Sequence, residues 1–130
     1  MQNLFLEESK HTPYVELNIE NKILKFKGNS YPEDTFEYYK PILAWINQLI
    51  ENINSDDNIK VLFELNYMNS SSFKILYNIC DLLLKLVDKG ASLEVLWIYD
   101  NENDVIEEIG EDLKDDFENL NIELKPIEVK

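Results

Sequence analysis

The chain has 130 residues, of which 45% are hydrophobic, so it can bury one hydrophobic core and has little room for a second. Its 26 acidic and 12 basic residues give a formal net charge of −14 at pH 7. This charge argues against nucleic acids and anionic membranes as partners, because both attract basic surfaces. No apolar run approaches the roughly 20 residues of a membrane span. We therefore expect one cytoplasmic domain over residues 1–130, without a disulfide because Cys80 is the only cysteine.

The first part of the chain predicts an arm and a hairpin. Residues 1–12 show no periodicity and are expected to form a loose arm. Apolar and polar side chains alternate over residues 14–20 and again over residues 23–27, which predicts two strands. Asn21 and Lys22 between them suit a tight turn. We expect this hairpin to lie at the edge of a sheet.

A helix is predicted next, over residues 34–53. Ser30 and Glu33 have the spacing of a capping box just before it. Pro41 lies inside the predicted helix and should kink it or separate its first turn, because proline lacks the backbone N–H.

The second half of the chain alternates predicted strands and helices. Residues 59–68 and 93–99 are nearly continuous apolar runs, and the first of them is typical of a strand covered on both faces. Residues 73–88 and 100–117 have apolar side chains at helical spacing, and residues 122–129 predict a final edge strand. The alternation predicts an α/β fold: a mixed, mostly parallel sheet of about five strands with three main helices.

No active site is predicted. Nucleophilic serine chemistry needs a neighbouring base, and the single histidine, His11, lies in the expected loose arm. No glycine-rich loop that could cradle a nucleotide phosphate occurs. Cys80 lies on the apolar face of its predicted helix and is expected to be a core residue.

A calcium-loop spacing occurs but lacks the residue that the loop needs. Its sixth place, where the sharp turn requires glycine, holds Val105. The acidic residues at the ligand spacing are Asp100, Glu102, Asp104 and Glu111. Because no active site and no complete metal-binding motif are predicted, we expect a protein that is not an enzyme and that uses no metal or cofactor.

The stretch 100–118 carries ten acidic residues and one lysine, Lys114. A solvated helix face is the usual role of such a stretch. Asp115, Asp116 and Glu118 lie near the C-terminus of the predicted helix, where the dipole disfavours negative charge. A surface that faces a partner is therefore the alternative role.

Asn69, Ser70, Ser71 and Ser72 lie where a predicted strand gives way to a predicted helix. The side chain of Asn69 or Ser70 can cap that helix, which stabilises it by about 1 kcal/mol. One cap needs one oxygen, so capping does not account for three hydroxyls. A phosphate here would lie at the positive end of the helix dipole, near Lys74, and add a charge of about −1.5 to −2. Local physics alone favours capping, with phosphorylation as the alternative.

The order of the predicted elements, with an Asn-Ser-Ser motif between a strand and a helix, resembles that of STAS domains, the fold of anti-sigma-factor antagonists. In those proteins a partner kinase phosphorylates the first serine of the motif. That place is held here by Ser70.

Over nearly its whole length the chain is more closely similar to the SiaC-like family of regulatory phosphoproteins, which are bacterial biofilm regulators. The similarity lies in residues 28–33 (Gly-Asn-Ser-Tyr-Pro-Glu), 39–45, 65–72 (Leu-Asn-Tyr-Met-Asn-Ser-Ser-Ser) and 97–100 (Trp-Ile-Tyr-Asp). The modified residue of that family is typically threonine, and Ser70 takes its place. Ser71 and Ser72 are the fallback acceptors, and Asn69 is the neighbouring cap.

The resemblance implies partner switching by a protein that is not an enzyme. A serine/threonine kinase of the histidine-kinase-like ATPase type would add the phosphate, and a PP2C-type phosphatase would remove it. The unphosphorylated form would bind and stimulate a diguanylate cyclase, which raises cyclic-di-GMP. A different hypothesis from the residues alone is a small ligand-binding module in which Ser70–Ser72 hold an anion at the helix N-terminus. The output protein, the oligomeric state and the interface stay open.

Overall fold

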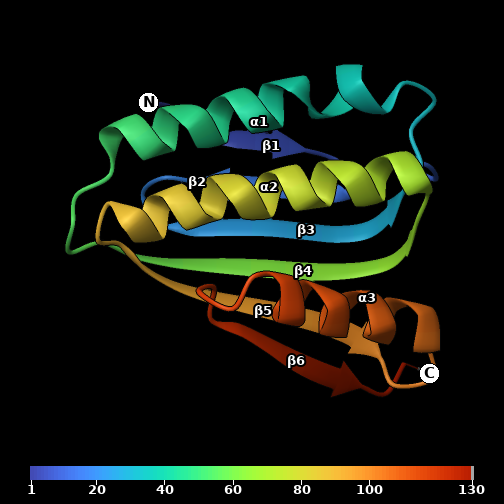
Figure 1. Ribbon diagram of the computed structural model, residues 1–130. Coiled ribbons are helices and arrows are strands. Elements are labelled where there is room, and N and C mark those ends of the chain that lie inside the picture. Colours follow the sequence, from blue (N-terminus) through green and yellow to red (C-terminus); the bar gives the residue numbers. More distant parts are fainter. Residues whose placement is uncertain (130) are drawn as a thin grey trace.

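The computed structural model describes residues 1–129. Its six strands form one sheet whose spatial order follows the chain order (Figure 1). The strands are β1 (Leu4–Leu6), β2 (Tyr14–Asn18), β3 (Ile23–Ser30), β4 (Asn58–Met68), β5 (Ser92–Asp100) and β6 (Ile122–Ile127). The pairs β1/β2 and β2/β3 are antiparallel, whereas β3/β4, β4/β5 and β5/β6 are parallel. The predicted α/β class with a mixed, mostly parallel sheet is confirmed.

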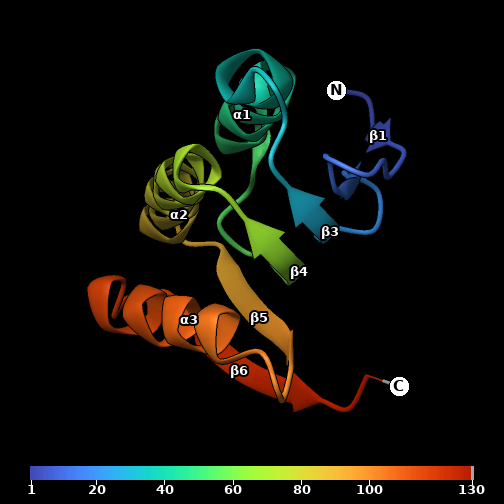
Figure 2. The ribbon, with the colours of Figure 1, turned by 90° about the vertical axis from the view of Figure 1, so that its right-hand side faces the viewer.

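Three helices connect the parallel strands and all lie on one face of the sheet (Figure 2). They are α1 (Thr35–Asn52), α2 (Ser70–Asp88) and α3 (Asp104–Asp116). The strand order never reverses, and right-handed crossovers that always step in the same direction place every helix on the same side. The prediction that the strand at residues 59–68 is covered on both faces is therefore wrong. Along β4, buried Val61 and Phe63 alternate with exposed Lys60 and half-buried Leu62.

The expected loose arm is partly wrong, because it supplies a sixth strand. β1 pairs with β2, so the predicted hairpin lies one strand in from the edge of the sheet. The indole Nε1 of Trp45 donates a hydrogen bond to the carbonyl of Gln2 at 2.7 Å, and the amide of Ile19 donates to Asn3 Oδ1 at 2.8 Å. These contacts tie the arm to α1 and to the turn after β2.

The first helix does not begin at the predicted capping box. Ser30 is the last residue of β3, is only 1% exposed and pairs with Met68 in the sheet, so it cannot cap a helix. Asp34 caps α1 instead. Pro41 lies inside α1 without dividing it, since the helix runs unbroken from Thr35 to Asn52.

One core fills the space between the sheet and the helices. Its largest fully buried side chains are Trp97, Phe26 and Phe63, and the two phenyl rings stack at 5.2 Å. Cys80 of α2 is buried in this core, as predicted, and burial raises the pKa of its thiol to about 12. None of the helices formed by residues 1–129 has both the length and the hydropathy that a membrane crossing needs.

Candidate functional site

The carboxyl ends of the parallel strands bring the three helix N-termini to the same edge of the sheet (Figure 1). Each helix is capped by a short polar side chain that accepts a hydrogen bond from an amide three residues on. Asp34, Asn69 and Asn103 accept at 3.1, 2.8 and 3.2 Å, respectively. Loops and the positive ends of the helices converge at this edge, which makes it a candidate for recognition of an anionic group.

The first turn of α2 contains the serine cluster. Asn69 caps the helix through the amide of Ser72, so Ser70 is the first helical residue and not the cap. The amides of Ser70 and Ser71 lie in the first turn, where helix geometry leaves N–H groups without an intrahelical acceptor. Both side chains are exposed. An exposed hydroxyl beside free amides is chemically suited to carry a phosphate.

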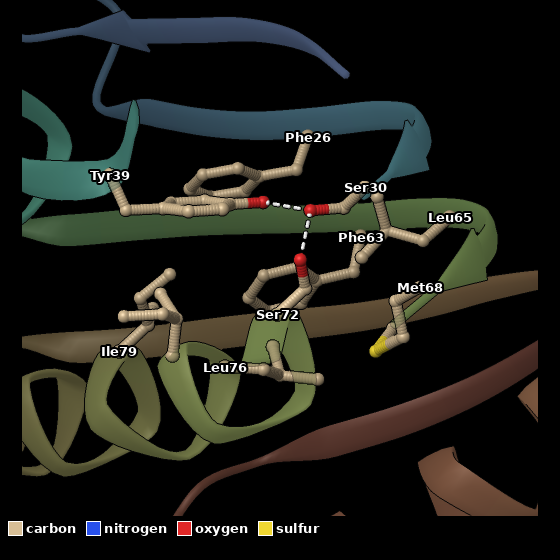
Figure 3. A pocket seen from close by; sticks show the side chains of 10 residues that line it. Phe26, Ser30, Tyr39, Phe63, Leu65, Met68, Ser72, Leu76 and Ile79 are labelled. Carbon is tan, nitrogen blue, oxygen red and sulfur yellow. Dashed lines mark hydrogen bonds between the residues drawn. The ribbon is translucent and has the colours of Figure 1, made fainter. Parts of the chain in front are cut away.

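Ser72 differs from its two neighbours because its side chain points into the protein. It is 4% exposed, and its Oγ accepts a hydrogen bond from Ser30 Oγ at 2.8 Å (Figure 3). Ser30 Oγ in turn lies 2.6 Å from the hydroxyl of Tyr39 on α1. A kinase cannot reach Ser72 without opening this turn. Of the two fallback acceptors, Ser72 is thus disfavoured by its burial.

These three hydroxyls border a small, partly open cavity of about 10 Å³. That volume is near the lower limit for one water molecule. Apolar side chains from β3, β4 and α2 line the rest of it, among them Phe26, Leu65 and Ile79 (Figure 3). Burial raises the pKa of Tyr39 to about 12, although its hydrogen bond with Ser30 acts in the opposite direction. Tyr39 therefore keeps its proton at neutral pH.

The two sequence segments around Ser30 and around the serine cluster meet at this edge. The amide of Asn69 donates to the carbonyl of Ser30 at 3.0 Å, and the rings of Tyr31 and Tyr67 meet edge to face at 5.4 Å. The ring of His11 packs on Tyr31 at 4.9 Å, so the single histidine lies beside this edge. Sequence reasoning gave Ser30 the role of a cap and gave Tyr39 no polar role. The signal that could have found Ser30 is its place inside one of the two segments.

Charge distinguishes the two exposed serines. Ser71 lines a surface hollow together with Glu33, Asp34 and Lys74. A phosphate on Ser71 would face the two carboxylates of that hollow. Ser70 does not line it, so a phosphate on Ser70 would not face these carboxylates. Lys74 is three positions after Ser71 and four after Ser70, so its ammonium can pair with a phosphate on either serine. These surroundings favour Ser70 over Ser71 as an acceptor.

Exposed apolar side chains gather at the same edge. We call the set Phe36, Tyr67, Val105 and Ile127 the apolar rim; all four are exposed, and they lie at the starts of α1 and α3 and near the ends of β4 and β6. The other exposed large apolar side chains include Phe5 on β1. Exposed apolar side chains along one edge of a sheet are candidates for contact with a protein partner.

The acidic stretch 100–118 is divided between a strand and a helix. Asp100 ends β5, and α3 begins only at Asp104. Two of the carboxylates have local partners: Asp116 accepts from the hydroxyl of Tyr77 at 2.5 Å, and Glu107 from that of Tyr99 at 3.1 Å. Within residues 1–129, no group of three His, Cys, Asp or Glu side chains is arranged to hold a metal ion.

The fold and this edge define a small α/β domain that presents an exposed serine in the first turn of a capped helix, beside an apolar rim. The chain belongs to the SiaC family of regulatory phosphoproteins, since the sequence model of that family matches residues 6–127. The Pseudomonas aeruginosa protein PA14_02130 (strain UCBPP-PA14) is 26% identical over 116 residues, which cover 89% of this chain and 90% of that protein.

Solved structures of SiaC proteins have the same fold. Apo-SiaC from Pseudomonas aeruginosa superposes with a TM-score of 0.87 at 24% identity, over 96% of this chain and 99% of that one. The SiaC chain in the crystal structure of the diguanylate cyclase SiaD with its activator SiaC, also from Pseudomonas aeruginosa, gives a TM-score of 0.87 at 23% identity. That alignment covers 95% of this chain and 99% of that one.

Proposed function

We propose that this chain is a partner-switching phosphoprotein without enzymatic activity, and that Ser70 is its phosphate acceptor. A serine/threonine kinase of the histidine-kinase-like ATPase type adds the phosphate, and a PP2C-type phosphatase removes it. The unphosphorylated form binds and activates a diguanylate cyclase in the cytoplasm. Membership of the SiaC family and the likeness to a SiaC chain bound to a cyclase support this proposal.

The observation that carries the proposal is the exposed side chain of Ser70 in the first turn of α2, at the same edge as the apolar rim. The free amides of that turn accommodate a phosphate without unfolding the helix. A partner that covers the apolar rim would bury the phosphate, and an unpaired buried charge costs several kcal/mol. Phosphorylation of Ser70 would therefore release the partner while the domain stays folded.

The first test maps the acceptor. The protein is incubated with ATP and a candidate kinase of this class, and the phosphate is located by mass spectrometry. We expect phosphate on Ser70 and none in the Ser70→Ala variant. Ser71→Ala is the matched control, because Ser71 is also exposed in the same turn and its loss should leave the phosphate in place. The absence of phosphate from Ser70, Ser71 and Ser72 would refute the proposal.

The second test measures binding to a diguanylate cyclase and the output of cyclic-di-GMP. Ser70→Ala should bind and activate the cyclase as the wild type does, whereas Ser70→Asp should bind more weakly because it carries a permanent charge. The same pair of changes at Ser71 is the control. If an inorganic anion instead raises the Tm of the wild type but not of the serine variants, the anion-binding module is the better description.

A further inference from the structure

The three serines of the cluster lie in one helical turn but in three different environments. Ser72 is buried and hydrogen-bonded, Ser71 lines the hollow with Glu33 and Asp34, and Ser70 is exposed outside it. Residues of an α-helix are rotated by about 100° from one to the next, so Ser70 lies about 200° around the helix from Ser72. Whatever holds Ser72 toward the core therefore directs Ser70 toward solvent.

Ser72 is held at two atoms. Its amide donates to the cap, Asn69 Oδ1, at 2.8 Å, and its Oγ accepts from Ser30 Oγ at 2.8 Å. The cap fixes where the helix starts along its axis, because it binds the main chain. The bond to Ser30 acts on a side chain and so fixes how the first turn is rotated about that axis.

The bond from Ser30 is itself supported from α1. Ser30 Oγ lies 2.6 Å from the hydroxyl of Tyr39, in a contact in which either oxygen can be the donor, and 2.8 Å from Ser72 Oγ. Tyr39 is 4% exposed and Ser30 is 1% exposed, so water does not compete readily for either hydroxyl. The result is a continuous row of hydrogen bonds that joins Tyr39 on α1, Ser30 at the end of β3 and Ser72 on α2 (Figure 3).

We propose that Tyr39 and Ser30 are positioning residues of the phosphorylation site, and that their hydroxyl chain selects Ser70 as the acceptor by locking Ser72 inward. The choice of acceptor in this inference rests on the proposed function. The orientation of the first turn of α2 does not depend on it. Loss of either hydroxyl leaves the turn free to rotate, so that Ser72 gains access to solvent and Ser70 loses its fixed orientation.

The test compares Ser30→Ala and Tyr39→Phe with Tyr38→Phe. Tyr38→Phe is a matched control, because Tyr38 is the residue next to Tyr39 on α1. It also loses one hydrogen bond, to the carbonyl of Pro13 at 3.2 Å, but that bond does not involve Ser30 or Ser72. The first measurement is hydrogen exchange of the Ser72 and Phe73 amides in the unphosphorylated proteins. We expect about ten-fold faster exchange in Ser30→Ala and Tyr39→Phe than in Tyr38→Phe at matched global stability. Equal exchange in all three variants would overturn the positioning role.

The second measurement is phosphorylation by the kinase that modifies the wild type. We expect about ten-fold slower modification of Ser70 in Ser30→Ala and Tyr39→Phe, with phosphate appearing on Ser72, and no change of site in Tyr38→Phe. Phosphate on Ser70 at the wild-type rate in all three variants would refute the selection of the acceptor and leave the proposed function intact. If no kinase modifies the wild type, the proposed function is refuted. Hydrogen exchange would still decide whether the hydroxyls of Tyr39 and Ser30 fix the first turn of α2.

Discussion

The two ends of the parallel strands differ in the side chains that they expose. The carboxyl end carries the helix N-termini, the serine cluster and the apolar rim. The amino end has a surface hollow that is lined by more polar residues than apolar ones. Its polar lining residues are Asn21, Lys22, Asn58, Lys60, Ser92, Glu94, Asn121 and Glu123.

Backbone hydrogen bonds pair the strands at the amino end, as they do at the carboxyl end. The amide of Lys60 donates to the carbonyl of Lys22, and the amide of Ser92 to that of Asp57, both at 2.9 Å. Polar side chains and paired backbone groups suit contact with water. The carboxyl end instead exposes apolar side chains, whose burial against a partner is favourable, and helix amides that can bind an anion. We therefore expect a protein partner to bind at the carboxyl end of the strands and not at the amino end.

The largest expected effect is on the stability of the packed core that lies between the two ends. Gly110 of α3 packs against the indole of Trp97, and a Cβ there would overlap that ring and the side chain of Leu124. Alanine normally stabilises a helix relative to glycine, but overpacking costs about 1 to 3 kcal/mol. Gly110→Ala should therefore lower the free energy of unfolding in urea by about 2 kcal/mol. Glu108→Ala, exposed on the same helix, should change it by less than about 0.5 kcal/mol.

The next effect is on partner binding and not on stability. It compares a residue of the apolar rim with an exposed apolar residue elsewhere. Phe36 is 62% exposed at the start of α1, and Phe5 is 55% exposed on β1. Phe36→Ala should weaken binding to a diguanylate cyclase about ten-fold, because a buried aromatic contact contributes 1 kcal/mol or more. Phe5→Ala should leave the Kd unchanged, and both variants should keep the wild-type Tm. An equal loss from both would place the interface elsewhere.

A smaller effect compares the two ends of α2. Asn69→Ala removes its cap and should cost about 1 kcal/mol of stability. Gly90→Ala, at the other end, forces alanine into φ +100° and should cost a similar amount, about 1 kcal/mol. Urea unfolding measures both losses. Only Asn69→Ala should alter the phosphorylation of Ser70; an equal change in Gly90→Ala would show that phosphorylation follows stability and not the geometry of the turn.

The smallest effect is a dependence on pH through Tyr39. Its pKa is about 12 in the folded protein because of burial, above the ordinary value of 10.0. A raised pKa contributes stability that is present below pH 10 and is lost as the pH rises from 10 toward 12, because the unfolded state ionises first. The wild type should therefore lose on the order of half a kcal/mol more than Tyr39→Phe between pH 7 and pH 10. Urea unfolding at the two pH values gives this difference, and an equal loss in both proteins would contradict it.

Much of the fold could be predicted because periodicity is a local property. The runs that became β4 and β5 and the helical spacing of α2 identified the element order, and that order predicts a parallel sheet. The prediction of two covered faces failed because Leu62 and Leu96 lie on the open face. They are cross-strand neighbours, with Lys25 and Glu123 flanking them in register, and Leu96 is only 6% exposed. Long charged side chains can cover apolar neighbours in this way without a helix.

The short strand β1 could not be predicted for a related reason. Three residues carry no periodicity, and what orders them is pairing with β2 together with the bond from Trp45 to Gln2, 43 positions away. A segment that takes its order from distant partners resembles a disordered arm in the sequence.

The sequence by itself determined the class of fold, the family resemblance and the place of Asn69–Ser72 at the start of a helix. The fold class and the helix start could be predicted because their signals, periodicity and capping residues, each involve residues close together in the sequence. Only the tertiary structure decided that Asn69 is the cap, that Ser72 is buried and that Ser70 is left exposed. The reason is that the decisive partner of Ser72 is Ser30, 42 residues away, which reaches it only when β3 and β4 are paired. Three identical residues in a row acquire different roles because one of them has a distant partner.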